Sequence, residues 1–196
     1  MAAGTSADAR VRKTKRLLRT NLAKLMEEKS VGDITVKELC AACDINRSTF
    51  YLHYKDVYDL LHSIETQLEE GFERVLSQAP IEALYTGQSG HVLDGVCQYL
   101  ADNADICRLF LCRASDNMAL VNRVKAVVQD RALAQWRRLY GGRTEWYEYT
   151  FAFIASGCIG MLQLWLQNGM PQPPERMAKL MEAFIAKCAQ ALGERG

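Results

Sequence analysis

Apolar residues recur at intervals of three and four along most of the chain, which is the spacing of one face of an α-helix. This pattern first predicts an amphipathic helix over residues 10–29. The N-terminal half of this helix is basic, and its C-terminal half has the apolar positions expected in a core. The apolar stripe consists of Leu18, Leu22, Leu25 and Met26.

Two much shorter helices are predicted next. The turn-forming run Ser30–Asp33 ends the first helix, and Thr35 with Glu38 three residues later forms a capping box that opens another. Two short helices joined by a tight turn, behind a longer helix, are typical of a helix-turn-helix. The short helices are predicted over residues 36–43 and 47–51, within a helix-turn-helix over residues 35–54.

The remaining chain keeps the helical pattern. A cap at Asp56 starts a long helix to about Leu76. No stretch alternates strictly between apolar and polar residues for long enough to predict a sheet, so the expected fold class is all-α. Two domains are predicted, over residues 1–71 and 72–196. Further helices are predicted over residues 91–102, 104–113, 117–140, 144–168 and 174–193.

Charge is distributed unevenly, although the 196 residues carry a net charge of only +1. Residues 1–56 contain 11 Lys and Arg against 7 Asp and Glu, whereas residues 57–196 contain 13 against 16, so the net charges are +4 and −3. Six of the cations lie between Arg10 and Arg19 with no anion among them. Such a cluster favours contact with an anionic polymer; a solvated helix face is the alternative.

The seven cysteines are scattered, and no secretory signal precedes them, so a reduced cytosolic setting is expected. Cys40 and Cys43 form one CxxC pair without a second pair or a histidine pair at zinc spacing. Both lie at helical spacing within an apolar pattern, which favours core packing. No metal and no cofactor are therefore expected.

The short helix over residues 47–51 and its flanks are rich in hydrogen-bonding side chains suited to phosphates and base edges. The surrounding run ITVKELCAACDINRSTFYLHYKDVYDLL, Ile34–Leu61, resembles the DNA-binding signature of the TetR family of bacterial transcriptional regulators. The resemblance covers residues 10–71. It departs at Asp44, where the family has Gly in the turn, and at Val57, where the family often has Lys. Aspartate tolerates the left-handed backbone that such a turn needs.

The resemblance implies a role in DNA binding for each matching position. The phosphate backbone would be held by Thr35, Tyr51, His53 and Lys55, with Lys55 replacing the missing family lysine. Base edges would be read in the major groove by Arg47, Ser48 and Thr49. Phe50 would be the apolar anchor, and Tyr54 would pack inside with its hydroxyl at a phosphate. For single Ser or Thr residues, helix capping is the alternative role, and for His53 it is surface hydrogen bonding.

Residues 150–166 carry no charge, yet 17 residues with internal glycines are too short for a bilayer, so a buried helix and no membrane contact are expected. The segment SGCIGMLQLWLQNGMPQPPERMA resembles regulators of dihydroxyacetone kinase operons within the TetR family. The family forms dimers through two late helices, here 144–168 and 174–193. The interface candidates are Leu162, Trp165, Met177, Leu180, Met181 and Phe184, with intramolecular core as the alternative.

Aromatic residues at helical spacing in the second domain are candidates for the lining of an effector pocket, although core packing is the alternative for each. The abundance of apolar and aromatic residues in this domain favours a modestly hydrophobic effector. The pocket candidates are Tyr99, Phe110, Trp136, Trp146, Tyr147 and Phe151.

These observations predict a non-enzymatic bacterial regulator. No nucleotide-binding, hydrolase or zinc-protease motif occurs, and the three histidines are dispersed. The expected protein is a cytoplasmic homodimeric repressor with an N-terminal DNA-binding domain and a C-terminal regulatory and dimerisation domain. A small-molecule effector would release it from a palindromic double-stranded operator. The alternatives are a DNA-binding regulator without a small ligand and a helical protein-interaction module.

Overall fold

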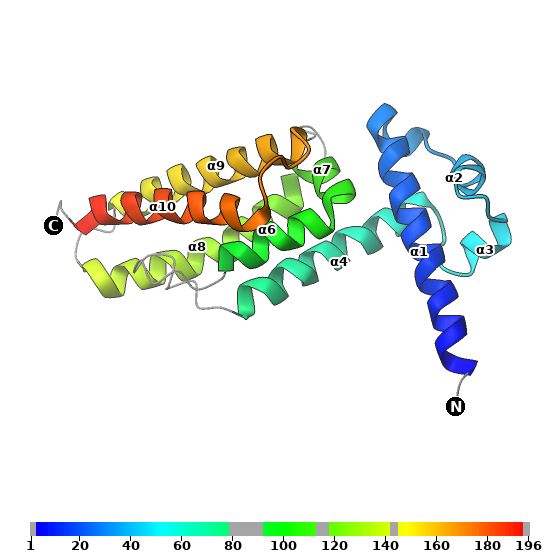
Figure 1. Cartoon of the computed structure of the whole chain (residues 1–196), viewed down its shortest axis with the longest axis horizontal. Coiled ribbons are helices and arrows are strands. Elements are labelled where there is room, and N and C mark those ends of the chain that lie inside the picture. The colour runs from blue at the N-terminus through cyan, green and yellow to red at the C-terminus, as the bar shows by residue number, and fades with distance from the viewer. Residues whose placement is uncertain (1–2, 79–91, 113–117, 142–144, 194–196) are drawn as a thin grey trace. The chain divides into compact units, whose positions relative to one another are not determined.

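The computed structural model describes residues 3–78, 92–112, 118–141 and 145–193. Every regular element within these ranges is a helix, which confirms the predicted all-α class. Contacts divide the chain into two compact units, Met1–Leu68 and Glu69–Gly196. Element labels are those of Figure 1.

The N-terminal unit is built on a long first helix, α1 (Ala3–Glu28), which a 3₁₀ turn, η1 (Val31–Asp33), connects to the helix-turn-helix. The helix-turn-helix consists of α2 (Val36–Ala42) and α3 (Arg47–Tyr51), and α4 (Val57–Ser77) begins in this unit. The α1 helix starts at Ala3, before the predicted start at residue 10, and the added residues include Ala7 and Ala9, which have high helix propensity. The core contains Leu18, Leu22, Leu39, Phe50 and Leu60, each fully buried.

The C-terminal unit is a helical bundle. In it α10 (Pro174–Gly193) packs against both α6 (Val92–Asp102) and α9 (Glu145–Gln167). In addition, α9 contacts α7 (Ala104–Cys112) and α8 (Met118–Tyr140). Figure 1 shows α9 and α10 side by side along one side of the bundle. Fully buried side chains that fill the bundle include Cys97, Ile106, Phe110, Trp136 and Leu166.

The helix ends in this unit follow the signals in the sequence closely. Gly169 ends α9 in the left-handed conformation, with φ of 74°, and Met170 follows with φ of 57°. The Met170 N–H donates to the Trp165 carbonyl at 2.8 Å, and the Trp165 indole donates to the Gln172 carbonyl at 2.9 Å. The glycine and proline that follow residue 168 therefore mark the end of α9, and hydrogen bonds from the backbone and from a side chain both stabilise this helix end.

Candidate nucleic-acid interface

The turn between α2 and α3 depends on Asp44, whose φ is 51°. The Ile45 N–H donates to the Cys40 carbonyl at 3.0 Å, and the Asp44 N–H donates to the Ala41 carbonyl at 3.2 Å. This pair of bonds is the Schellman arrangement that ends helices at a left-handed residue. The predicted left-handed conformation of Asp44 is confirmed, and it sets the direction in which α3 leaves α2.

Replacing Asp44 by glycine is expected to raise the free energy of unfolding by about 0.5–1 kcal/mol, because glycine adopts positive φ without a clash at Cβ. Asp44→Ala keeps the Cβ, so it is the matched control and is expected to be less stable than Asp44→Gly. Urea denaturation followed by circular dichroism measures both. Equal stability of the glycine and alanine variants would contradict the backbone argument.

The start of α2 is capped as predicted. The Glu38 N–H donates to the Thr35 hydroxyl oxygen at 3.2 Å. The Glu38 carboxylate in turn accepts a hydrogen bond from the Lys29 ammonium at 2.5 Å, and this bond holds the pKa of Glu38 below its ordinary value. Since Lys29 directly follows α1, the cap also ties the first helix of the motif to α1. Thr35 is exposed at this end of α2.

Phe50 anchors α3 to the unit. Its side chain is fully buried, and its ring centroid lies 5.5 Å from that of Tyr51 and 5.9 Å from that of Tyr54. Arg47 and Ser48 of this five-residue helix are exposed. A helix this short has little stability of its own, so burial of Phe50 is what holds the polar face toward solvent.

The segment after α3 is held by the start of α4. The Lys55 N–H donates to the Asp59 carboxylate at 2.9 Å, and the Asp59 N–H donates to the Asp56 carboxylate at 2.8 Å. Tyr54 is buried, which raises the pKa of its hydroxyl, and the Lys15 ammonium lies 6.0 Å from its ring centroid. This last contact places a cation of α1 beside the end of the helix-turn-helix.

The structure therefore gathers the predicted DNA-binding residues in the N-terminal unit, at the N-cap of α2, on α3 and in the segment that follows α3. Five of them, Thr35, Arg47, Ser48, Tyr51 and Lys55, are exposed, Thr49 and His53 are half-buried, and Tyr54 is buried. Figure 1 shows the N-terminal half of α1 extending past α2 and α3. Exposed cations on that half of α1 are Arg10, Arg12, Lys13, Lys15 and Arg16.

The CxxC pair lies in the core of the same unit. Cys40 and Cys43 are both buried, which confirms the predicted core packing, and the Cys43 thiol lies 3.6 Å from the Leu17 carbonyl. Burial raises the pKa of Cys43 to about 11, so its thiol stays protonated and poorly nucleophilic near neutral pH.

Most of the predicted pocket residues lie in the interior of the C-terminal unit. The Trp136 and Tyr147 rings lie 6.1 Å apart, and the Tyr147 hydroxyl donates to the Gly141 carbonyl at 2.6 Å. Tyr99 is half-buried with its ring 4.9 Å from that of Phe72. Phe110, Trp136, Tyr147 and Phe151 are buried, whereas Trp146 is exposed on α9.

An open groove lies between α4 and α8. It has a volume of about 590 Å³, and the Arg131 guanidinium in it donates to the Leu76 carbonyl at 3.2 Å. Its lining is mostly charged and contains none of the predicted pocket residues. The lining residues are Glu70, Glu73, Arg74, Leu76, Ser77, Val127 and Arg131.

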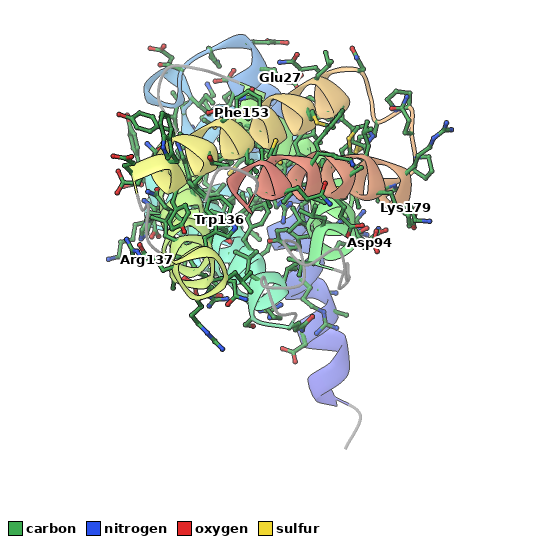
Figure 2. The ribbon with its side chains drawn as sticks, turned by 90° about the vertical axis from the view of Figure 1, so that its left-hand side faces the viewer. Glu27, Asp94, Trp136, Arg137, Phe153 and Lys179 are labelled. Atoms are coloured by element: carbon green, nitrogen blue, oxygen red, sulfur yellow. The ribbon has the colours of Figure 1, made fainter. Side chains whose placement is uncertain are left out.

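The interface candidates separate into two groups. Leu162, Trp165, Met177 and Met181 are buried within the protomer, whereas Leu180 and Phe184 are exposed on α10. Further exposed apolar side chains on α9, which are not among the predicted interface residues, are Trp146, Tyr149, Phe153 and Leu164. Figure 2 labels Phe153 on α9 and, for comparison, the buried Trp136 on α8.

The α9 helix is long and apolar enough to cross a membrane by length and composition, but only 28% of its most apolar window is buried inside the protomer. The prediction that this helix is buried is thus confirmed for one face of α9 only, and the rest of the helix is open. Gly157 and Gly160 lie on the open side between Phe153 and Leu164, and a Cβ at either would meet nothing within 4 Å. Such a surface lets another helix approach closely.

A family model described as the C-terminal region of transcriptional regulators, TetR_C_8, matches residues 89–187, about half of the chain. The solved structure of "Dihydroxyacetone kinase operon activator DhaS" is similar, with 13% identity, a TM-score of 0.60 and coverage of 91% of this chain and 97% of that one. The "fatty acid degradation regulator FadR from Bacillus halodurans" has 12% identity, a TM-score of 0.62 and coverage of 88% and 94%. No curated protein matches the chain.

The family match and the all-helical fold with its N-terminal helix-turn-helix define the class, which is that of DNA-binding transcriptional regulators. Within this class, the chain belongs to the TetR family. The predicted family is therefore confirmed.

Proposed function

We propose that the protein is a cytoplasmic, non-enzymatic, homodimeric repressor that binds a palindromic operator and is released from it by a small-molecule effector. The observation that carries this function is α3, whose buried Phe50 holds Arg47 and Ser48 in solvent, behind a basic first helix. Hydrogen-bonding side chains on a fixed helix can read base edges in the major groove, and clustered cations attract the phosphate backbone.

The position of each residue relative to α3 determines whether it is assigned to base edges or to phosphates. Arg47, Ser48 and Thr49 lie at the start of α3 and are assigned to base edges, because recognition helices contact bases through their N-terminal residues. Phosphates are assigned to groups around this helix. They are Thr35, Tyr51, His53, Tyr54 and Lys55, together with the exposed cations on the N-terminal half of α1.

The second copy of the chain is assigned to the open apolar faces of α9 and α10. These faces carry large side chains such as Phe153 and Phe184 that the protomer leaves exposed. Burial of contiguous apolar surface drives association of subunits. A two-fold dimer presents two recognition helices, and these meet successive major grooves when they lie about 34–36 Å apart.

Release requires an effector that binds the free dimer more tightly than the DNA-bound one, because only differential affinity shifts the equilibrium. The α4 helix is the proposed lever, since it begins in the N-terminal unit and ends in the C-terminal one. Effector contacts are assigned to the C-terminal unit, with the half-buried Tyr99 and the aromatic residues around it as the proposed lining.

Selection of bound sequences from random duplexes tests the proposal and returns the operator with its symmetry. Fluorescence anisotropy at several salt concentrations then measures affinity, and a small-molecule screen looks for release. A palindromic site, steep salt dependence and at least one releasing compound are expected. Absence of sequence preference would overturn the proposal.

A reporter assay tests whether the protein represses or activates transcription, since one similar structure is that of a protein named as an activator.

Replacing Arg47 by alanine is expected to weaken operator binding by about 1–3 kcal/mol per half-site, because a bidentate contact from arginine to guanine is lost. Non-specific DNA is expected to lose far less affinity. Anisotropy titrations with the selected operator and a scrambled duplex measure the difference. Lys24→Ala, which removes an exposed cation of α1 outside the proposed interface, is the matched control. Equal losses on both duplexes would assign Arg47 to phosphate instead.

A further inference from the structure

Leu52 is the most exposed of the large apolar side chains that the structure describes, with an exposed fraction of 79%. It follows α3 directly as its C-cap residue, with helical backbone angles, and its N–H donates to the Ser48 carbonyl at 3.2 Å. The next turn is also ordered, because the His53 N–H donates to the Phe50 carbonyl at 2.9 Å. The backbone therefore holds this leucine in solvent.

Helical spacing places Leu52 on the exposed side of α3. Arg47, Ser48, Tyr51 and Leu52 stand at positions i, i+1, i+4 and i+5 and are all exposed, whereas Phe50 between them is buried. Residues four apart lie on the same helix face, so Leu52 is one turn beyond Ser48. If α3 enters the major groove as proposed above, Leu52 enters it with the base-reading residues.

The chemistry of base edges identifies what an apolar side chain can recognise there. In the major groove, guanine, cytosine and adenine present hydrogen-bonding groups, and thymine alone adds a methyl group, at C5. Leucine cannot donate or accept a hydrogen bond, but it gains free energy when its methyl groups exclude water from another apolar group. Its neighbours Arg47 and Lys55 are cationic, which favours nucleic acid over an apolar protein surface as the occupant.

We infer that Leu52 is a specificity-determining residue that contacts the C5 methyl group of one thymine in each operator half-site. This inference rests on the proposed DNA-binding function. If it holds, the operator must contain a thymine at one fixed position of each half-site. That thymine is recognised by a side chain that cannot form hydrogen bonds.

Deoxyuridine tests the contact, because it pairs as thymidine does and lacks only the methyl group. Each thymine of the selected operator is replaced in turn, symmetrically in both half-sites, and binding is measured by anisotropy. One position is expected to lose about four-fold in affinity per half-site, since burial of one methyl group contributes about 0.8 kcal/mol. The other thymines are expected to tolerate the change.

The protein variants assign the methyl group to its partner. Leu52→Ala is expected to bind thymine and deoxyuridine operators equally, and Leu52→Met, which keeps an apolar side chain of similar size, is expected to retain discrimination. Leu139→Ala is the control, because Leu139 is an exposed leucine on α8 in the C-terminal unit and is expected to leave discrimination unchanged. Substitution at so exposed a position has little effect on folding, which circular dichroism verifies.

The outcomes separate the two claims. Specific operator binding without any sensitive thymine would overturn the role of Leu52 and leave the proposed function standing. A sensitive thymine that remains sensitive in Leu52→Ala would assign the methyl contact to another residue and also overturn the inference. Failure of the wild-type protein to prefer any sequence would instead overturn the proposed function, and the inference with it.

Discussion

Replacing Phe50 by alanine is expected to unfold the helix-turn-helix and abolish operator binding, while the C-terminal unit stays folded. Truncation of a buried phenylalanine costs about 3–5 kcal/mol, and the side chain of Phe50 is completely buried. A unit of 68 residues has only about 3–10 kcal/mol of stability in total, so this loss removes much of it. Few other side chains can compensate, because α3 has five residues.

Hydrogen exchange measured by mass spectrometry on the full chain distinguishes the two units. Amides of α2 and α3 are expected to lose protection in Phe50→Ala, and those of α6 and α10 to keep it. Phe50→Leu is the matched control, because it keeps most of the apolar volume and is expected to cost less than about 1.5 kcal/mol. Undiminished protection of α3 in Phe50→Ala would contradict the assignment of Phe50 as the anchor.

The helix-turn-helix could be predicted from the sequence because its signals are local. Thr35 and Glu38 mark the start of α2 by a capping pattern that involves only neighbouring residues. Asp44 marks the turn, because few residues other than glycine adopt positive φ, and it was identified at the position where the family has glycine. The place of Phe50 in the family signature predicts its role as the anchor, and its complete burial agrees with that role.

The sequence alone does not single out Leu52, because an apolar residue beside a short helix can lie on the buried or on the exposed side. Its exposure depends on where Phe50 packs, which is a tertiary contact. The spacing of Ser48 and Leu52 was the available signal, since residues four apart share a helix face.

The arrangement of α9 could not be predicted to the same depth. Residues 150–166 are apolar on every side, so no stripe marks the buried face, although the ends of the helix were predicted to within one residue. Leu162 and Trp165, selected as interface candidates, lie in the core of the protomer, whereas Phe153 was not selected and is exposed. Tertiary packing determines which of these positions is buried, and the sequence pattern alone does not distinguish them.

Replacing Phe153 by glutamate is expected to convert the protein into monomers and to lower operator affinity by at least about 100-fold. Phe153 has an exposed fraction of 72% on the open face of α9, where the second copy is proposed to bind. A two-fold interface would bury the new carboxylate twice, and an unpaired buried charge costs several kcal/mol. Monomers bind one half-site at a time, so they lose the effective concentration that links the two recognition helices.

Sedimentation analysis at micromolar concentration measures the oligomeric state, and anisotropy with full and half operators measures the affinities. Leu139→Glu places the same charge on an exposed leucine of α8, outside the proposed interface, and is expected to remain dimeric and fully active. The half operator is expected to bind Phe153→Glu and wild type equally, because the recognition helix itself is unchanged. A dimeric Phe153→Glu would exclude the α9 face as the interface and would direct attention to other exposed surfaces. A monomeric variant with full operator affinity would show that dimerisation does not contribute to DNA binding.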